Sequence, residues 1–186
     1  MLIKIFGAYP WTVEDEKFNQ TESNTKNKFS PNAIKTIIDR VSGRITDFKE
    51  KNPSMPEVKL FYSRLRATSG TFVLNSIRDR MKNAYAVIFD ITGFNPNVIL
   101  ELGIALELQQ QIEKPAKVFL ISCSDHYNEK LLPSDIRGYF LTTYQINEKT
   151  GAVKFGDYGS LEMRITSDII EMLNISYIEQ VVGEQK

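Results

Sequence analysis

Cysteine, histidine and tryptophan are nearly absent from this sequence of 186 residues, which contains one of each. A single cysteine cannot form an internal disulfide. Because Cys123 lies in the apolar run VFLISC, we expect a small core residue in a reducing compartment. His126 stands alone in the polar segment SDHYNEK, without a second ligand at metal-binding spacing. The sequence therefore predicts no metal site and no redox chemistry.

Net charge is also lacking, because 23 Lys and Arg balance 23 Asp and Glu. A neutral surface does not attract a polyanion as a whole, which argues against general nucleic-acid binding. No apolar run approaches the roughly 20 residues that cross a bilayer. The opening segment MLIKIFGAY lacks the basic and long apolar regions of a signal peptide. We therefore expect a cytoplasmic protein that does not bind a membrane.

Short apolar runs alternate with helical patterns, which is typical of a mostly parallel sheet covered by helices on both faces. The length suits one α/β domain, which we place at residues 1–176, followed by a polar tail at 177–186. Strands are predicted at residues 2–9, 58–65, 84–91, 117–123 and 141–146. Helices are predicted from residue 31, at about 72–83, from residue 96 and around 161–173. Residues 12–30 are polar and predict a surface loop or flap.

The segment DITGFNPN, residues 90–97, joins the most apolar strand to a helix, with Asn95 as N-cap and Pro96 at the first helical position. In open parallel sheets, ligands bind outside the carboxyl ends of the strands, where helix N-termini favour phosphate or carboxylate groups. We therefore predict a nucleotide site here, with Asp90, Thr92 and Asn97 as contacts. Neither G-x-x-x-x-G-K-[ST] nor G-x-G-x-x-G occurs, so the common phosphate-binding loops are excluded.

Glu101 is the candidate catalytic residue. It follows Asn97 by four positions, so the two share a helix face, and its neighbours in NVILELGIALEL are apolar. A glutamate inside a helix is ordinarily a solvated surface charge, as we expect for Glu107. The apolar neighbours favour a more buried position for Glu101, in which its carboxylate would be available for chemistry.

Aromatic and basic residues at two other strand ends extend the candidate site. Tyr9 and Trp11 follow the first strand and would stack on a base or ring, or else pack in the core. Arg64, Arg66 and the turn at 68–71, which contains Ser69, would hold phosphates at the end of the second strand, or else form a solvated basic loop.

The stretch AYAVIFDITGFNPNVILELGIALEL resembles the signature of TIR-like nucleotide-binding proteins and of nucleoside 2-deoxyribosyltransferases. The matching pieces are the strand ending in Asp90, the Asn95-Pro96-Asn97 turn, and Glu101-Leu102-Gly103 followed by Ala105. IKIFGAYPW, with Gly7 and Ala8, more weakly resembles the first strand and substrate loop, and LPSDIRGYFLTTY a late segment. The resemblance implies a flavodoxin-like (TIR-like) three-layer fold with about five strands, and a catalytic role for Glu101.

The same resemblance implies an enzyme that cleaves the N-glycosidic bond of NAD, by hydrolysis or by forming an ADP-ribose-derived signal, in bacterial antiphage defence. NAD would then be a substrate, with no cofactor required. A homo-oligomer is expected, and a separate effector protein is a possible partner. Two alternatives stay open: a nucleoside 2-deoxyribosyltransferase, and a nucleotide-sensing or adaptor domain without turnover. In these families, serine, tyrosine or acidic residues accompany the catalytic glutamate. Residues 12–30 contain no reliable match to them, which leaves the identity of the substrate open.

Cleavage of NAD and transfer from a nucleoside differ in their need for an acid. Nicotinamide leaves NAD as a neutral molecule, so one carboxylate suffices. A nucleoside base must instead be protonated or hydrogen-bonded as it leaves, and Asp90 is the candidate for that role. In both cases the carboxylate of Glu101 would stabilise an oxocarbenium-like state or attack it.

Overall fold

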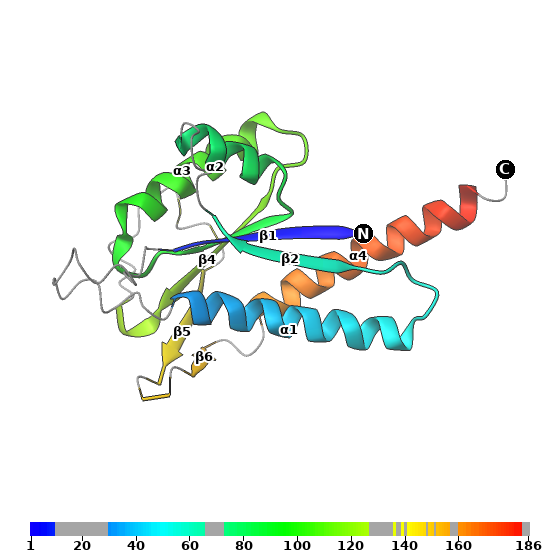
Figure 1. Cartoon of the computed structure of the whole chain (residues 1–186), viewed down its shortest axis with the longest axis horizontal. Coiled ribbons are helices and arrows are strands. Elements are labelled where there is room, and N and C mark those ends of the chain that lie inside the picture. The colour runs from blue at the N-terminus through cyan, green and yellow to red at the C-terminus, as the bar shows by residue number, and fades with distance from the viewer. Residues whose placement is uncertain are drawn as a thin grey trace.

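The computed structural model describes residues 1–9, 30–65, 73–126, 136, 139, 141–147, 149–150, 152–156 and 160–183. Within these residues, strands alternate with α-helices from β1 to β4, and β5 and β6 then precede the last helix (Figure 1). The strands are β1 (Leu2–Ala8), β2 (Lys59–Arg64), β3 (Ala86–Asp90), β4 (Lys117–Cys123), β5 (Leu141–Ile146) and β6 (Val153–Phe155). The α-helices are α1 (Ser30–Lys51), α2 (Val73–Lys82), α3 (Pro96–Gln111) and α4 (Ser160–Gly183). The predicted α/β class is confirmed.

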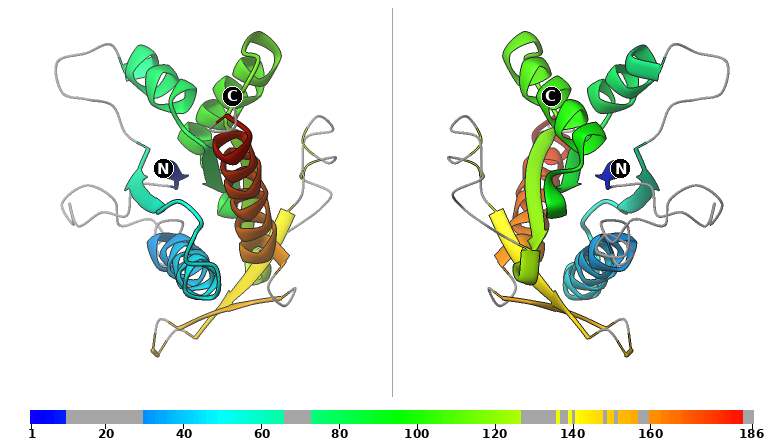
Figure 2. Two further views of the ribbon diagram at one scale, coloured as in Figure 1. Left: turned by 90° about the vertical axis from the view of Figure 1, so that its right-hand side faces the viewer. Right: turned by 90° about the vertical axis from the view of Figure 1, so that its left-hand side faces the viewer.

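The strands form one sheet in the order β2-β1-β3-β4-β5-β6. β1 to β5 are parallel to one another, and β6 pairs with β5 in the antiparallel direction. β3 is buried at each of its residues, as expected for a central strand covered on both faces. The sheet is therefore mostly parallel, as predicted, and it curls toward its β5 and β6 edge (Figure 2).

Helices cover both faces of the sheet (Figures 1 and 2). α1 and α4 share one core cluster with Ile3 and Ile5 of β1, whereas α2 and α3 share a second cluster with Phe6 and Ala8 of the same strand. This division follows from the period of two along a strand, which turns successive side chains to opposite faces. The predicted apolar stripe of α1 is buried throughout, at Ile34, Ile37, Ile38, Val41 and Ile45.

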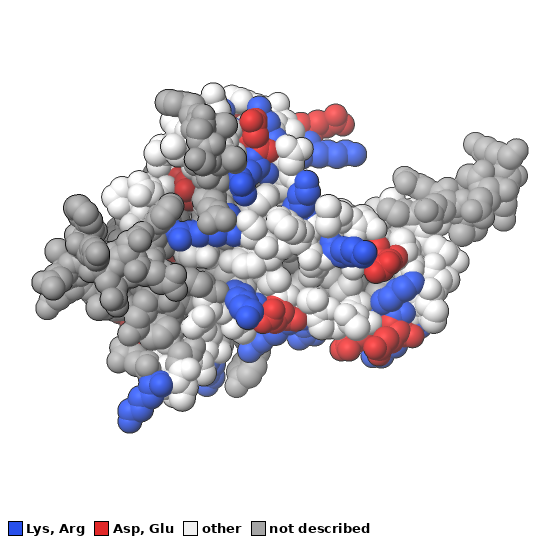
Figure 3. All heavy atoms as spheres, in the orientation of Figure 1, with Lys and Arg blue, Asp and Glu red and all other residues white. Residues whose placement is uncertain are grey.

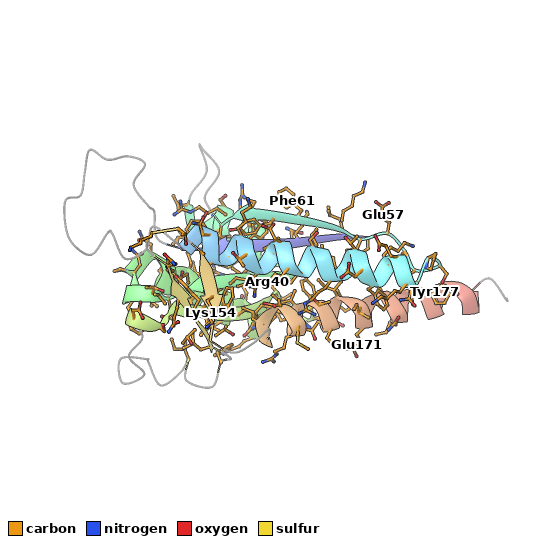
Figure 4. The ribbon with its side chains drawn as sticks, turned by 90° about the horizontal axis from the view of Figure 1, so that it is seen from below. Arg40, Glu57, Phe61, Lys154, Glu171 and Tyr177 are labelled. Atoms are coloured by element: carbon orange, nitrogen blue, oxygen red, sulfur yellow. The ribbon has the colours of Figure 1, made fainter. Side chains whose placement is uncertain are left out.

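A buried carboxylate also joins α1 to α4, which lie side by side (Figure 4). Glu162 of α4 is 5% exposed, and its oxygens lie 3.3 Å from Nη1 of Arg40 and 3.8 Å from Nη2 of Arg44. Both arginines come from α1 and keep about half of their side-chain surface in water. A charge as buried as that of Glu162 requires such partners, so the pairs fix the two helices in register.

Two features near the C-terminus differ from the sequence-based expectations. β6 is not predicted, because three residues are too few to show an alternating pattern. The tail expected from residue 177 is instead helical as far as Gly183. A helix already nucleated by buried turns lengthens without a new nucleation cost, which explains this extension. Residues 12–29 of the predicted flap lie outside the described residues.

Acidic and basic side chains are interspersed on the face of the molecule seen in Figure 3. This mixture agrees with the equal numbers of the two charge types in the sequence. Among the helices of the described residues, none combines the length and apolar character needed to cross a membrane.

Candidate functional site

The strand order creates a switch point between β1 and β3. β1 lies between β2 and β3 in the sheet, so the chain leaves β1 toward one edge and continues from β3 toward the other. α1 follows β1 and packs on one face, whereas α3 follows β3 and packs on the opposite face. In open α/β sheets, the crevice at the carboxyl ends of two such strands is the usual ligand site. The carboxyl ends here are at Ala8 and Asp90.

The β3 strand continues into α3 through a tight turn. Gly93 and Phe94, which lie within a short 3₁₀ turn at Thr92–Phe94, both have positive φ, at 69° and 51°. Gly93 adopts this conformation without a steric penalty, whereas Phe94 does not. The Asn95 side chain then accepts hydrogen bonds from the backbone N–H groups of Asn97 (3.0 Å) and Val98 (3.4 Å). The predicted N-cap, with Pro96 at the first helical position, is confirmed.

Glu101 lies in the second turn of α3 and is half-buried. Its neighbours Leu102 and Ala105 are in the core, at 2% and 4% exposed. Burial raises the pKa of the Glu101 carboxyl from 4.5 to about 7, and the nearby positive charge of Arg64 opposes this rise. The side chain is therefore taken partly out of water, as its apolar sequence neighbours predict, and it titrates near neutral pH.

Arg64 and Tyr9 meet at the carboxyl ends of β2 and β1. Nη2 of Arg64 donates a hydrogen bond to the Tyr9 carbonyl oxygen at 2.9 Å, and its guanidinium carbon lies 4.4 Å from the centroid of the Tyr9 ring. Stacking of a guanidinium on an aromatic face is favourable and holds both groups in place. The structure thus brings together two predicted binding residues, in a position from which Arg64 acts electrostatically on Glu101.

Asp90, by contrast, lies entirely inside the protein, at 0% exposed. Oδ1 accepts hydrogen bonds from the backbone N–H of Thr92 (3.0 Å) and from its hydroxyl (2.5 Å), and Oδ2 accepts one from the Tyr144 hydroxyl (2.6 Å). Thr92 is itself 0% exposed, and its hydroxyl oxygen accepts the backbone N–H of Cys123 at 2.8 Å. In this structure, Asp90 and Thr92 are internal groups, and their role as ligand contacts stays a prediction.

Gly7 and Ala8 are also buried. A Cβ atom added to Gly7 would lie 2.8 Å from the Tyr62 hydroxyl oxygen and 3.0 Å from Cδ1 of Ile34. The missing side chain therefore makes room for Tyr62 and Ile34, and Ala8 belongs to the core on the opposite face. Both residues therefore pack inside the protein at the carboxyl end of β1, and their contact with a substrate stays a prediction.

The remaining predicted residues divide into two groups. Asn97 is exposed on the first turn of α3, where its backbone N–H serves the Asn95 cap. Trp11, Arg66 and Ser69 lie outside the described residues. Tyr144 was missed by the sequence analysis, because a tyrosine in the short strand LTTYQI carries no signal that its hydroxyl reaches a carboxylate on another strand.

A cavity of about 260 Å³ lies away from the switch point. Its lining comes from the C-terminal half of α1, the segment before β2, and Leu173 of α4. The apolar part of this lining consists of Ile45, Phe48, Met55, Pro56, Val58 and Leu173. Among the described residues, His, Cys, Asp and Glu form no group of three or more that could hold a metal ion.

Comparison of the chain with protein-family models, with curated proteins and with solved structures gives no match. The assignment of function therefore rests on the residues at the switch point and on their environment.

Proposed function

We propose that this protein cleaves the N-glycosidic bond between nicotinamide and ribose in NAD, with Glu101 as the catalytic carboxylate. The observation that carries the proposal is the position of Glu101: a half-buried carboxylate in the second turn of a helix that begins beside the β1/β3 switch point. The strand order β2-β1-β3-β4-β5, with helices on both faces, supports a flavodoxin-like, three-layer architecture for this site.

The chemistry requires a negative charge close to the reacting sugar carbon. When the bond from C1′ to the nicotinamide nitrogen breaks, its electron pair leaves with nicotinamide, and positive charge develops on the ribose. The Glu101 carboxylate stabilises that charge or bonds to C1′, and water or another hydroxyl then adds to C1′ with loss of a proton. Where a bond from C1′ to Glu101 has formed, this addition breaks it and releases the carboxylate. Bound NAD also brings a positively charged ring, which favours the ionised form of Glu101 over the protonated form that burial favours.

The environment of Asp90 supports NAD over a nucleoside as the substrate. A departing purine or pyrimidine needs a proton donor or a hydrogen-bond donor. Asp90 is the acid that the sequence offers for this role, but its carboxylate is closed to solvent and accepts three hydrogen bonds from Thr92 and Tyr144. Nicotinamide needs no such acid, so a site that relies on the half-buried carboxylate of Glu101 suits NAD.

The test is incubation of the purified protein with NAD, followed by chromatography of the products. We expect release of nicotinamide by the wild type, and a loss of about 100-fold or more in Glu101→Gln, because removal of one well-placed electrostatic contact typically has that effect. Glu107→Gln is the matched control, since Glu107 lies on the same helix but pairs at the surface with Arg78. Equal activity in Glu101→Gln and wild type would contradict the assignment of Glu101.

Incubations with deoxynucleosides or with nucleotides distinguish NAD cleavage from the two alternative functions. Exchange of bases between two deoxynucleosides, without loss of NAD, would identify a deoxyribosyltransferase instead. A nucleotide that raises the melting temperature without any product would identify a sensor or adaptor domain.

Self-association and a role in antiphage defence form the last part of the proposal. If the active form is a homo-oligomer, NAD cleavage will rise more steeply than linearly with protein concentration. Strict proportionality over a hundredfold range would favour a monomeric enzyme. Expression beside a phage challenge, in wild type and Glu101→Gln, tests the defence role, with or without a separate effector protein.

A further inference from the structure

We propose that Tyr144 of β5 is a positioning residue for Glu101, which it places through a sealed chain of hydrogen bonds formed by Asp90 and Thr92. The inference rests on the proposed function of Glu101 and deepens it. Tyr144 lies on a strand that does not border the switch point, so its role is not evident from proximity to the candidate site.

The buried carboxylate of Asp90 depends on the hydrogen bonds that Thr92 and Tyr144 donate to it. Asp90, Thr92 and Tyr144 are each 0% exposed, so water does not replace a lost hydrogen bond. Three donated hydrogen bonds converge on the Asp90 oxygens, which matches the acceptor-only character of an ionised carboxylate. Hydrogen bonds to charged, buried groups are the strongest class in proteins, and an unmatched one is correspondingly unfavourable.

Thr92 connects this hydrogen-bond network to the start of α3. Both the backbone N–H and the hydroxyl of Thr92 are bonded to Asp90, so Thr92 is fixed at two points. Only residues 93–95 separate it from Pro96, the first residue of α3. Two of those three have positive φ, a conformation that an L-residue such as Phe94 keeps only when its surroundings hold it.

The other partners of Asp90 and Thr92 in this network come from β4 and β5. The Thr92 hydroxyl accepts the backbone N–H of Cys123 at the end of β4, and the Tyr144 hydroxyl donates to Asp90 from β5. The Tyr144 ring is held in turn by an edge-on contact with Phe155, at 6.1 Å between ring centroids. The network therefore positions the first turns of α3, which carry Glu101, against the neighbouring strands β3, β4 and β5.

The experiment compares Tyr144→Phe with Tyr85→Phe. Both changes remove one buried tyrosine hydroxyl, but that of Tyr85 has no hydrogen-bond partner among the described residues. We expect kcat for NAD cleavage to fall about tenfold or more in Tyr144→Phe, because small misplacements of a reacting group have effects of that size. KM should change less than twofold, and Tyr85→Phe should match the wild type in both constants.

A second readout follows Glu101 itself. NMR titration of its carboxyl carbon, assigned with Glu101→Gln, measures the pKa without any turnover. In Tyr144→Phe, a loosened start of α3 exposes Glu101 to more water, so its pKa should move from about 7 toward 4.5, with Arg64 still beside it. A merely structural role would lower the melting temperature and leave this pKa in place. An unchanged Glu101 pKa and an unchanged kcat in folded Tyr144→Phe would overturn the inference.

Threonine variants keep the inference testable if Tyr144→Phe does not fold. Thr92→Val removes the hydroxyl in the network, and Thr142→Val makes the same change at a threonine that is 1% exposed and whose hydroxyl has no described partner. We expect Thr92→Val to reproduce the Glu101 pKa shift, Thr92→Ser to restore the wild-type value, and Thr142→Val to cause no shift. A Glu101 pKa that does not respond to Thr92→Val would contradict the inference.

The two proposals fail in distinguishable ways. If the wild type leaves NAD intact but Tyr144→Phe moves the Glu101 pKa, the positioning role stands and the proposed function fails. If Glu101→Gln abolishes NAD cleavage but Tyr144→Phe and Thr92→Val leave both kcat and the Glu101 pKa unchanged, the function stands and the positioning role fails.

Discussion

At the scale of single residues, two carboxylates only eleven positions apart in the sequence have opposite environments. Asp90 is completely enclosed and accepts three hydrogen bonds, whereas Glu101 is half-buried beside apolar side chains. The first environment surrounds a carboxyl group with hydrogen-bond donors, whereas burial in the second disfavours the charged form and raises the pKa. The two residues therefore suit different tasks: Asp90 holds structure, and Glu101 is available for chemistry.

The raised pKa of Glu101 predicts a specific pH dependence of stability. Because the folded pKa is about 7 and the ordinary value 4.5, the folded protein binds more protons than the unfolded chain between these values. The contribution of Glu101 to the free energy of unfolding is thus fully present below pH 4.5 and is lost as the pH rises through 7. Urea unfolding at pH 4.5 to 8 should show this loss in wild type relative to Glu101→Gln. A constant difference between the two proteins would place Glu101 in open solvent.

Gly7→Ala should destabilise the protein by about 1 to 3 kcal/mol, the usual range for forcing a methyl group into a packed site. The added Cβ would contact the Tyr62 hydroxyl oxygen at 2.8 Å and the tip of Ile34 at 3.0 Å. Tyr62→Phe in the same chain removes the closer contact, so the double variant should recover part of the loss. Additive effects of the two changes in urea unfolding would show that Gly7 and Tyr62 do not interact.

The sequence predicts some properties of single residues at the site and not others. The N-cap role of Asn95 and the partial burial of Glu101 follow from local patterns, namely the Asn-Pro pair and the apolar neighbours. The enclosure of Asp90 depends on Tyr144, which is 54 residues away. A partner at that distance is set by strand order, which no local pattern contains, and this is why the sequence does not predict the enclosure of Asp90 and Thr92.

At the scale of elements, α3 is the helix that carries the candidate chemistry, and its start depends on one cap. Asn95→Ala removes the side-chain oxygen that receives two backbone N–H groups, so we expect a loss of about 0.5 to 2 kcal/mol. Asn95→Asp keeps an acceptor at the same place and should stay near the wild-type stability. Thermal unfolding of the three proteins measures the difference, and equal melting temperatures for Asn95→Ala and wild type would argue against the cap.

The sequence predicts long elements with strong periodicity well. It does not predict the short strand β6 or the last turns of α4. The stripe of α1 and the apolar run of β3 appear in both sequence and structure because each fills a buried surface with a regular spacing. β6 has three residues and owes its existence to pairing with β5. The last turns of α4 follow from the helix before them rather than from their own composition.

At the scale of the whole molecule, the lone cysteine is a reporter of global unfolding. Cys123 is 3% exposed at the end of the central strand β4, and burial raises the pKa of its thiol. Both effects slow its reaction with alkylating reagents, since the thiolate is the reactive form. We expect one label per chain in urea and almost none in the native protein, as measured by mass spectrometry after a short iodoacetamide pulse. Rapid labelling of the native protein would contradict the buried position.

The overall architecture could be predicted only in part. Alternating strands and helices indicate a mostly parallel sheet, but they do not state which strands are neighbours. The order β2-β1-β3-β4-β5-β6 decides that β1 and β3 lie together, and thus that Tyr9, Arg64 and Glu101 belong to one edge. The resemblance predicts a catalytic role for Glu101, and the strand order determines which residues surround it.

The direction of α4 has a practical consequence. The helix begins after β6 and runs toward the amino ends of the parallel strands, so its C-terminal end lies far from the carboxyl ends of β1 and β3 (Figure 1). An affinity tag or surface tether attached beyond the C-terminal end of α4 would leave the carboxyl ends of β1 and β3 facing the solution. Immobilised protein could then be supplied with ligands in flow, without the attachment itself obstructing their entry.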